Sequence, residues 1–238
     1  MSIFEGREQM PGQMVQFAAN GGTCDGYLAT PAAGGKHLGV VVIQEWWGLV
    51  GHIKDVAERF ASEGFVALAP DLYHGKQAAE PDEAGKLMMS LQAQEVVKDL
   101  DGAVAYLLGN ERVAGERVGV VGYCLGGGLS LYEACHNPSK IGACVVYYGV
   151  LPGWQPDLSK LEASVLGLYA ERDSYMPPPA VDELRKQLQS LGKKADLRVY
   201  PDTDHGFFND DRPEVHDKGA AKDAWQRTVQ FFKTNLRP

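Results

Sequence analysis

Cys124 lies in a pattern of small residues that is typical of a catalytic nucleophile. The segment GYCLGG, residues 122–127, follows a short apolar run at residues 118–121 and precedes a helical pattern over residues 125–136. A chain that turns sharply from strand to helix at its nucleophile needs small residues two positions before and after it, and glycines occupy both positions. Free backbone N–H groups and the helix dipole at a helix start also favour a thiolate. The pattern predicts nucleophilic chemistry at sulfur.

Two further residues supply the base and the orienting group that nucleophilic catalysis requires. His205 follows an expected strand over residues 196–200, and Asp173 follows another over residues 165–169. Both therefore fall in loops at the carboxyl ends of strands. The chain order nucleophile, acid, histidine is that of the α/β-hydrolases. We predict that Cys124 attacks, His205 acts as base and acid, and Asp173 orients His205.

An oxyanion that forms during such an attack needs two backbone N–H donors. One comes from the residue after the nucleophile, which is Leu125, and one from the loop after an early strand, where Trp46 is the candidate. Loss of one donor of this kind costs about 3 to 4 kcal/mol of barrier lowering. The loop that carries Trp46 is therefore expected to matter as much as the triad.

Each predicted catalytic residue also has a structural interpretation. A cysteine in an apolar sequence is often a buried packing residue, and a histidine can be a capping or core residue. Asp173 can be a turn residue, in which case Glu171 or Asp182 is the alternative orienting acid. The three glycines at residues 126–128 lack both the dinucleotide fingerprint and the Lys-Ser/Thr ending of a P-loop, so phosphate binding is not expected.

The apolar pattern predicts the elements that position these residues. Continuous apolar runs, typical of strands buried on both faces, occur at residues 38–43, 65–69, 118–121, 143–148 and 165–169. A turn signal between residues 14–17 and 23–29 predicts a hairpin before them. Helical patterns occur at residues 53–61, 96–108, 125–136, 180–191 and 220–236. This alternation predicts an α/β fold of the α/β-hydrolase type, a mostly parallel sheet with helices on both faces, and a loop over residues 73–85 above its edge.

Size and composition predict a single domain spanning residues 1–238, which we expect to be monomeric. With 45% hydrophobic and 23% charged residues, the 238-residue chain has the composition of an ordinary globular protein. A net charge of -8 argues against nucleic-acid and anionic-membrane partners and favours a small-molecule substrate. Residues 1–8 lack the apolar segment of a secretory signal, so a cytoplasmic location is expected. Four scattered cysteines without a Cys-x-x-Cys pair predict neither a metal site nor a disulfide framework, and no cofactor is expected.

The motifs taken in order resemble those of the dienelactone hydrolase family, the carboxymethylenebutenolidases. The resemblance runs from the early hairpin to the last helix and rests on four segments: QEWWG at residues 44–48, the cysteine elbow, Asp173 before a proline, and HGF at residues 205–207. It implies a cysteine, histidine and aspartate triad that opens a cyclic unsaturated ester through an acyl-thioester. It also implies that Glu45 contacts the resting thiol and is displaced by substrate. The alternative for Glu45 is a buried carboxylate paired with an arginine such as Arg172.

Candidate substrate-binding residues are aromatic or polar groups near these motifs. They are Trp47, Tyr73, Lys76, Tyr148, Phe207 and Asn209, and an aromatic pocket would also draw on Trp46, Trp154, Tyr175 and Phe208. Family members specialised for the anionic dienelactone hold its carboxylate with arginines after the Asp-Leu-Tyr strand end and shortly after the histidine. This chain has no arginine at those places, although Lys76 and Arg212 are nearby, and Lys lacks the bidentate geometry of Arg. A different or less specific ester is therefore an alternative substrate.

Other functions are compatible with the same residues. The triad alone permits hydrolysis of a thioester, a peptide or another ester. A protein that senses redox state or a ligand would use Cys124 for reversible oxidation, and it would need a resolving cysteine, of which Cys135 is nearest in sequence. Ester turnover after an initial burst distinguishes the enzyme from the sensor.

Overall fold

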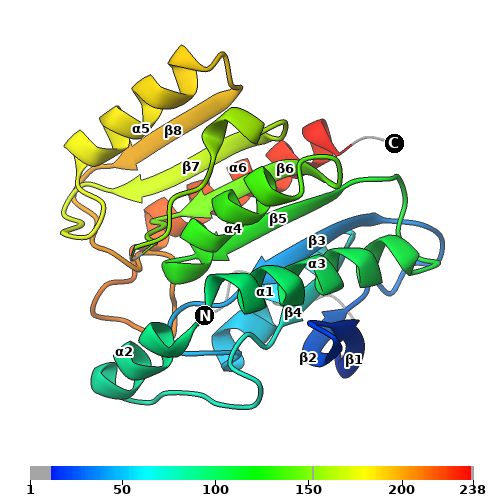
Figure 1. The fold of residues 1–238 in the computed structure, drawn as a ribbon. Helices are drawn as coiled ribbons and strands as arrows, with labels where there is room; N and C mark the ends of the chain where they lie inside the picture. The colour runs from blue at the N-terminus through cyan, green and yellow to red at the C-terminus, as the bar shows by residue number, and fades with distance from the viewer. Residues whose placement is uncertain (1–11, 152, 237–238) are drawn as a thin grey trace.

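The computed structural model describes residues 12–151 and 153–236. Residues 1–8, on which the expectation about a signal segment rests, lie outside this part of the chain. Within the described ranges, eight strands form one sheet in the order β1-β2-β4-β3-β5-β6-β7-β8. The strands are β1 (Gln13–Ala19), β2 (Gly22–Ala29), β3 (Leu38–Ile43), β4 (Phe65–Pro70), β5 (Val118–Tyr123), β6 (Ile141–Tyr147), β7 (Ser164–Ala170) and β8 (Ala195–Tyr200). Figure 1 shows the sheet with its helices.

The strands at the centre of the sheet are buried, and those at its two edges are exposed. Strands β4 and β5 are buried at every residue, and β3 at all but its first, because helices cover both of their faces. The edge strands β1 and β8 are largely exposed. β1 and β2 pair antiparallel as the predicted hairpin, β2 pairs antiparallel with β4, and the pairs from β4 through β8 are parallel. The prediction of a mostly parallel sheet is confirmed.

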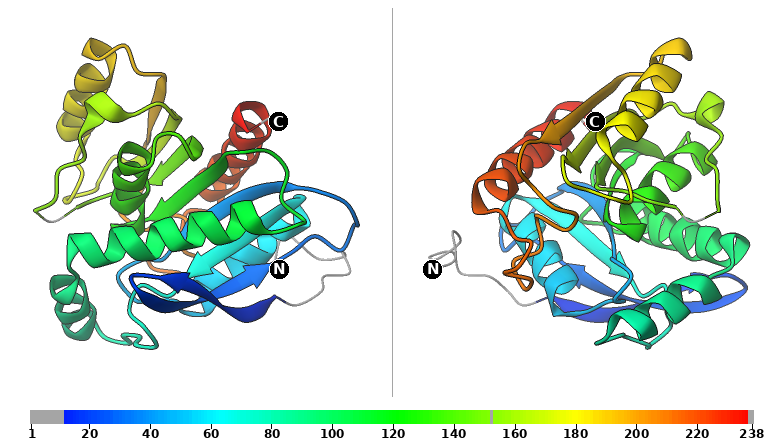
Figure 2. Two further views of the ribbon diagram at one scale, coloured as in Figure 1. Left: turned by 45° about the vertical axis from the view of Figure 1, so that its right-hand side comes forward. Right: turned by 90° about the vertical axis from the view of Figure 1, so that its left-hand side faces the viewer.

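Two hydrophobic cores lie on the two faces of the sheet. The helices are α1 (Gly51–Ser62), α2 (Pro81–Ser90), α3 (Ala93–Gly109), α4 (Leu125–His136), α5 (Pro178–Ser190) and α6 (Lys218–Asn235), with a short 3-10 helix η1 (Leu158–Lys160). Buried residues of α3, α4 and α5 form one core, and those of α1 and α6 form the other. Figure 2 shows α6 and α1 on one side of the sheet and α3 to α5 on the other.

Helix α2 was not predicted. The expected loop over residues 73–85 contains its first half, because Pro81 and Gly85 resemble loop residues, yet Pro81 stands at the first turn of the helix, where a missing N–H has no consequence. None of the helices in the described ranges is both long and apolar enough to cross a membrane.

The strands that follow β3 in sequence are added to the sheet on opposite sides of it. β4, the next strand in sequence, pairs with one edge of β3, and β5 pairs with the other. The loops that leave the carboxyl ends of β3 and β5 therefore diverge, and ligands of open α/β sheets bind at such a point. Gln44 to Gly48 follow β3 and Cys124 follows β5.

Candidate active site

Cys124 adopts the strained backbone of a nucleophile elbow. It stands between β5 and α4 with φ 55° and ψ -119°, in a region that L-residues avoid at a cost of about 1–3 kcal/mol. A Cβ on Gly122 would lie 1.9 Å from the carbonyl oxygen of Gly126, and a Cβ on Gly126 would lie 2.4 Å from the carbonyl oxygens of both Ile43 and Gln44. The two glycines let the chain turn back on itself and let α4 start directly against the loop after β3.

Backbone hydrogen bonds hold the elbow in this strained form. The Cys124 N–H donates to the Tyr147 carbonyl at 3.1 Å, and the Cys124 carbonyl accepts from Gly127 and Val150 at 2.9 and 3.2 Å. The N–H groups of Leu125 and Trp46 donate to no other residue that the structure describes. Both amides are therefore free to bind an incoming oxygen, which is the chemical requirement of an oxyanion hole.

Asp173 and His205 form a hydrogen-bonded pair. Nδ1 of His205 lies 2.7 Å from Oδ2 of Asp173, whose side chain has no exposed surface. The second oxygen, Oδ1, accepts hydrogen bonds from the N–H groups of Tyr175 at 2.8 Å and Met176 at 3.2 Å. The carboxylate is thus fixed in place. Because Nδ1 donates to it, Nε2 is the ring nitrogen left for proton exchange with a nucleophile.

The charge state of His205 is set by its neighbours. Burial lowers the pKa of His205, but hydrogen bonding and charge from Asp173 and Cys124 outweigh burial and raise it to about 10. Cys124 is thus close enough to act on the imidazole. Nε2 makes no hydrogen bond in the structure. The thiol and the imidazole are therefore neighbours on one pocket wall, and Nε2 has no competing hydrogen bond.

Two tyrosine rings flank the imidazole. Tyr148 lies 4.9 Å and Tyr175 5.1 Å from the His205 ring, measured between centroids. Tyr148 is fully buried, has φ 37°, and its hydroxyl has no hydrogen-bond partner in the structure. Tyr175 is 66% exposed. The imidazole is therefore held between a core ring and a surface ring.

Glu45 binds a residue other than those that sequence reasoning considered. It is 3% exposed, and its Oε2 accepts a hydrogen bond of 2.7 Å from Nδ2 of Asn209. No hydrogen bond joins Glu45 to Cys124 in this structure, and the resting contact implied by the resemblance stays a prediction. The alternative partner, Arg172, instead pairs with Asp202 and Asp204.

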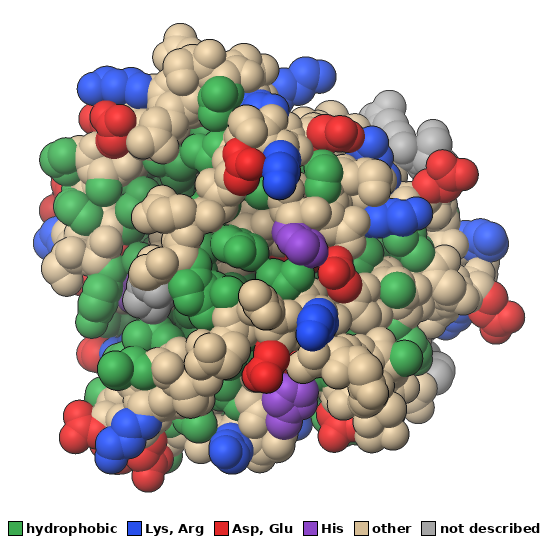
Figure 3. Space-filling model, in the orientation of Figure 1, with side chains coloured by type: hydrophobic (Ala, Val, Ile, Leu, Met, Phe, Trp, Pro, Cys, Tyr) green, Lys and Arg blue, Asp and Glu red, His purple; other side chains and the backbone are tan. Residues whose placement is uncertain are grey.

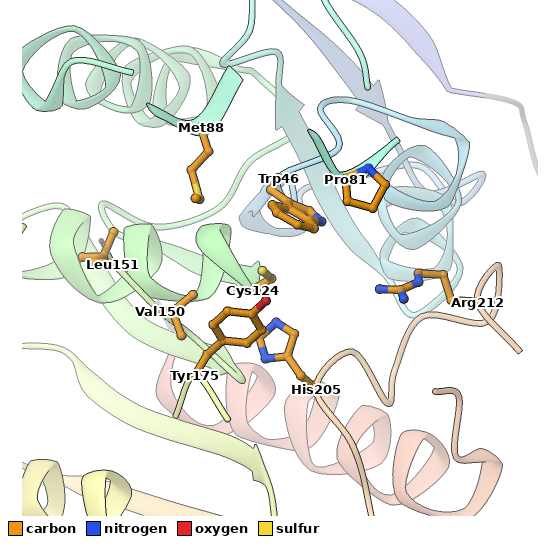
Figure 4. Close-up of a pocket in the computed structure, with 9 residues that line it drawn as sticks. All are labelled: Trp46, Pro81, Met88, Cys124, Val150, Leu151, Tyr175, His205 and Arg212. Carbon is orange, nitrogen blue, oxygen red and sulfur yellow. The ribbon is translucent and has the colours of Figure 1, made fainter. Parts of the chain in front are cut away.

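A largely apolar pocket of about 600 Å³ opens at Cys124. Figure 4 shows Cys124 and His205 side by side on its wall, with the Arg212 guanidinium at a distance from them. The residues that line the pocket are Trp46, Pro81, Met88, Cys124, Val150, Leu151, Tyr175, His205 and Arg212. In Figure 3, hydrophobic side chains are most frequent over the left half of the face shown. The pocket suits a small, mainly apolar substrate.

None of the six candidate substrate-binding residues lines this pocket. Tyr148 and Phe207 are fully buried in the core of α1 and α6, and Asn209 is committed to Glu45. Tyr73 is buried in the core on the opposite face of the sheet. Burial is the main cause that raises the pKa of Tyr73, and the charge of the nearby Cys124 is the second. Lys76 is exposed. Trp47 supports the wall indirectly, because the Arg212 guanidinium lies 5.8 Å from its ring.

Sequence reasoning missed the apolar part of the wall. Pro81 and Met88 come from α2, and Val150 and Leu151 follow β6. These residue types carry no chemical signature that separates a pocket from a core. The available signal was position alone, since residues 73–85 and the segment after residue 148 both follow strands at the carboxyl edge of the sheet.

Comparison with known proteins places this geometry in context. A sequence model of the dienelactone hydrolase family matches residues 24–236. "Protein usf" of Aquifex pyrophilus is 40% identical over 231 residues, which cover 94% of this chain and 99% of that protein. A protein of Aquifex aeolicus named "Putative carboxymethylenebutenolidase" is 34% identical over 232 residues, which cover 95% of this chain and 100% of that protein.

Solved structures give the same picture. A crystal structure described as "Putative Dienelactone Hydrolase" from Klebsiella pneumoniae superposes with a TM-score of 0.85 at 30% identity, covering 93% of this chain and 98% of that one. A "Dienelactone Hydrolase-like Promiscuous Phospotriesterase" from metagenomic libraries has a TM-score of 0.87 at 21% identity, covering 97% and 100%. Because the sequence identity to this second structure is only 21%, the likeness shows a shared fold and carries no information about activity.

Proposed function

This chain belongs to the dienelactone hydrolase family and is a hydrolase, and from that premise we propose that it cleaves a lactone or small carboxylic ester through a Cys124, His205 and Asp173 triad. The observation that carries the proposal is the 2.7 Å Asp173–His205 hydrogen bond beside a strained Cys124 on one pocket wall. A packing cysteine has no need of strain or of a neighbouring imidazole.

In the proposed first step, Nε2 of His205 holds the proton of the Cys124–His205 pair, as its pKa of about 10 requires at neutral pH, and Sγ of Cys124 attacks the carbonyl carbon of the ester. The carbonyl oxygen becomes an oxyanion, which the N–H groups of Leu125 and Trp46 stabilise. Collapse of this intermediate breaks the carbon–oxygen bond, and His205 returns the proton to the leaving alkoxide. With a lactone the alkoxide stays tethered to the acyl group, so the ring opens.

In the second step, water replaces the alcohol as the attacking group. His205 removes a proton from the water, hydroxide adds to the thioester carbonyl, and the carbon–sulfur bond breaks. The products are a carboxylic acid and Cys124, and the proton taken from water stays on Nε2 of His205, as at the start of the cycle. Asp173 keeps Nδ1 protonated throughout, so that Nε2 always faces the reacting atoms.

Glu45 is proposed to contribute negative charge next to the site while it is held by Asn209. The family resemblance implies that it contacts the resting thiol and that substrate displaces it, which favours the thiolate paired with His205. In this structure Asn209 holds Oε2 of the carboxylate at 2.7 Å.

The pocket wall limits the substrate class that we propose. It is mainly apolar, and its basic side chains are Arg212 and the proposed catalytic His205. Arg212 also pairs with Glu214 at 2.8 Å, so a substrate carboxylate would compete with that acid. We therefore propose a small, mainly apolar lactone or ester.

The test uses p-nitrophenyl acetate and a panel of lactones with and without a carboxylate. The wild-type chain is expected to give a burst of product followed by turnover, and Cys124→Ala and His205→Ala are expected to give neither while keeping the wild-type circular dichroism spectrum. Full activity in either variant would refute the triad. Labelling of Cys124 without turnover of any ester would instead favour a sensor.

A further inference from the structure

Three metal-ligating side chains meet at the hairpin end of the sheet, away from the triad in sequence. Cys24 lies on β2, His74 in the turn after β4, and Asp99 on α3. Each offers one ligand atom, and these atoms all lie within 4.8 Å of one another. Because the three residues are far apart along the chain, no spacing motif marks them.

The acidic member of this cluster has an unsatisfied oxygen. Asp99 is 2% exposed; its Oδ2 lies 3.0 Å from Nε2 of His74, and its Oδ1 has no hydrogen-bond partner in the structure. A buried acceptor left without a partner carries a free-energy cost, because nothing replaces the water that it loses. A fold normally removes such a cost with a donor or a cation, and a cation between Asp99, His74 and Cys24 would do so.

The surroundings of Cys24 are negative. Its thiol is fully buried and lies 3.3 Å from the carbonyl oxygen of Asp25 and 3.7 Å from that of Asp71. The buried carboxylate of Asp99 is a further negative group, with an oxygen within 4.8 Å of the sulfur. These carbonyl oxygens and this carboxylate favour a positive ion at the sulfur.

The turn that carries His74 is built by a separate carboxylate. Asp71 accepts hydrogen bonds from the N–H of Tyr73 at 3.1 Å and of Gly75 at 2.6 Å, and His74 has φ 50°. Both carboxylate oxygens of Asp71 therefore accept backbone hydrogen bonds. His74 is the side chain of this turn that can bind a metal ion. The His74 side chain is 52% exposed, which provides an entry path from solvent.

We propose that Cys24, His74 and Asp99 form a zinc site with one position open to water. Thiolate, imidazole and carboxylate are the ligands of protein zinc, and three of them with an open fourth position form a tetrahedral site. Zinc bonds of about 2.0–2.3 Å place the ligand atoms about 3.3–3.6 Å apart, so the side chains close slightly around the ion. The thiol proton of Cys24 leaves to solvent as the sulfur–zinc bond forms, and His74 binds as the neutral imidazole.

Zinc at this position would join three elements of the fold. It would link β2, the turn over residues 71–75 and α3, and the same turn leads into α2, which lines the catalytic pocket with Pro81 and Met88. The turn and the segment after it would lose mobility when the ion binds. The free energy of unfolding would rise with free zinc as expected for a ligand of the native state.

The test uses the full chain carrying Cys124→Ala, so that the catalytic thiol cannot bind the ion, after EDTA treatment and dialysis. Calorimetric titration is expected to show one Zn²⁺ per chain. Co²⁺ is expected to give a thiolate-to-cobalt absorption band in the near ultraviolet. Adding Cys24→Ser is expected to abolish the band, and adding His74→Ala to weaken Zn²⁺ binding at least about tenfold. Because His74 is half exposed, its variant tests the site even if Cys24→Ser fails to fold.

The matched control is His136→Ala in the same background. His136 is a similarly exposed histidine paired with an aspartate, since its Nε2 lies 3.5 Å from Oδ2 of Asp101, but among the residues that the structure describes no cysteine ligand completes a cluster there. Zinc affinity in this variant is expected to equal that of Cys124→Ala alone. Absence of stoichiometric Zn²⁺ binding to Cys124→Ala, or binding that His74→Ala leaves unchanged, would overturn the proposal.

Discussion

Glu45 and Asn209 form a buried hydrogen bond of 2.7 Å that joins the loop after β3 to the loop after β8. Both residues are at most 3% exposed. Asn209 is itself fixed, because its Oδ1 accepts a hydrogen bond of 3.0 Å from the N–H of Asp211. The two loops carry Trp46 and His205, so this bond sets the distance between the proposed oxyanion donor and the proposed base.

Replacing Asn209 by alanine is expected to lower the free energy of unfolding by about 1–3 kcal/mol, because the Glu45 carboxylate loses its buried donor. Urea unfolding measures the change. The control is Gln16→Ala, which removes a 3.0 Å hydrogen bond to the exposed Asp25, where water can replace the lost donor. Equal effects of the two substitutions would contradict the role assigned to burial.

Gly126→Ala is expected to reduce ester hydrolysis by at least about 10²-fold, because small displacements of reacting groups have effects of that size. The new Cβ would lie 2.4 Å from two backbone carbonyl oxygens, and backbone cannot rotate aside as a side chain can. Either α4 or the loop after β3 must shift. Both carry proposed oxyanion donors.

Gly85→Ala is the control for this substitution. Gly85 lies in α2 with open space around its added Cβ. Alanine there is expected to raise the free energy of unfolding by about 0.5–1 kcal/mol through helix propensity and to leave hydrolysis near the wild-type rate. Wild-type activity in Gly126→Ala would contradict the packing argument for the elbow.

Asp173→Asn is expected to lower kcat for p-nitrophenyl acetate by up to about 10⁴-fold, the size of the effect in serine proteases, where the amide holds the histidine in the wrong tautomer. Glu171→Gln provides the matched comparison. Glu171 is an exposed acid two positions away that accepts a hydrogen bond of 2.9 Å from the N–H of Asp202. It should retain nearly full activity. If Glu171→Gln were the inactive variant, the orienting acid would be Glu171.

The fold was largely predictable because apolar patterns report burial directly. The predicted limits of β3 (Leu38–Ile43) and α4 (Leu125–His136) match the structure residue for residue. Helix α2 was missed because its amphipathic pattern is short and interrupted by Gly85, so packing rather than propensity decides it.

The candidate site was predictable where residue chemistry and chain position coincide, as for Cys124 and His205, which share one pocket. Aromatic residues offered no such double signal. Phe207 and Tyr148 neighbour His205, yet their rings are buried among other aromatic rings. A sequence states how large and apolar a side chain is, but the direction in which it points depends on the packing of distant segments.

Iodoacetamide is expected to alkylate Cys124 selectively in the folded protein. Cys124 lines the pocket, whereas Cys24, Cys135 and Cys144 are at most 2% exposed. Burial first, with neighbouring acids second, raises the pKa of Cys24 and of Cys135 to about 12, so neither forms much of the reactive thiolate at neutral pH. Peptide mass spectrometry identifies the modified residue. Labelling of Cys135 at a similar rate would revive the sensor interpretation.

The pH dependence of stability follows from His205. Asp173 and Cys124 raise the pKa of His205 to about 10 in the folded chain despite its burial, whereas an unfolded histidine titrates near 6.5. A group with a raised folded pKa binds its proton more tightly in the folded state. Its contribution to the free energy of unfolding is therefore fully present below about pH 6.5, and it is lost as the pH rises toward about 10.

Urea unfolding of wild-type and His205→Gln chains across this pH range tests the argument. The difference between their free energies of unfolding is expected to shrink steadily from about pH 6.5 to about pH 10. In an Asp173→Asn background, which removes the hydrogen bond that raises this pKa, the pH dependence of the same difference is expected to flatten. A difference that stays constant with pH in the wild-type background would show that His205 takes no extra proton on folding, and the Asp173–His205 pair would then hold the neutral imidazole.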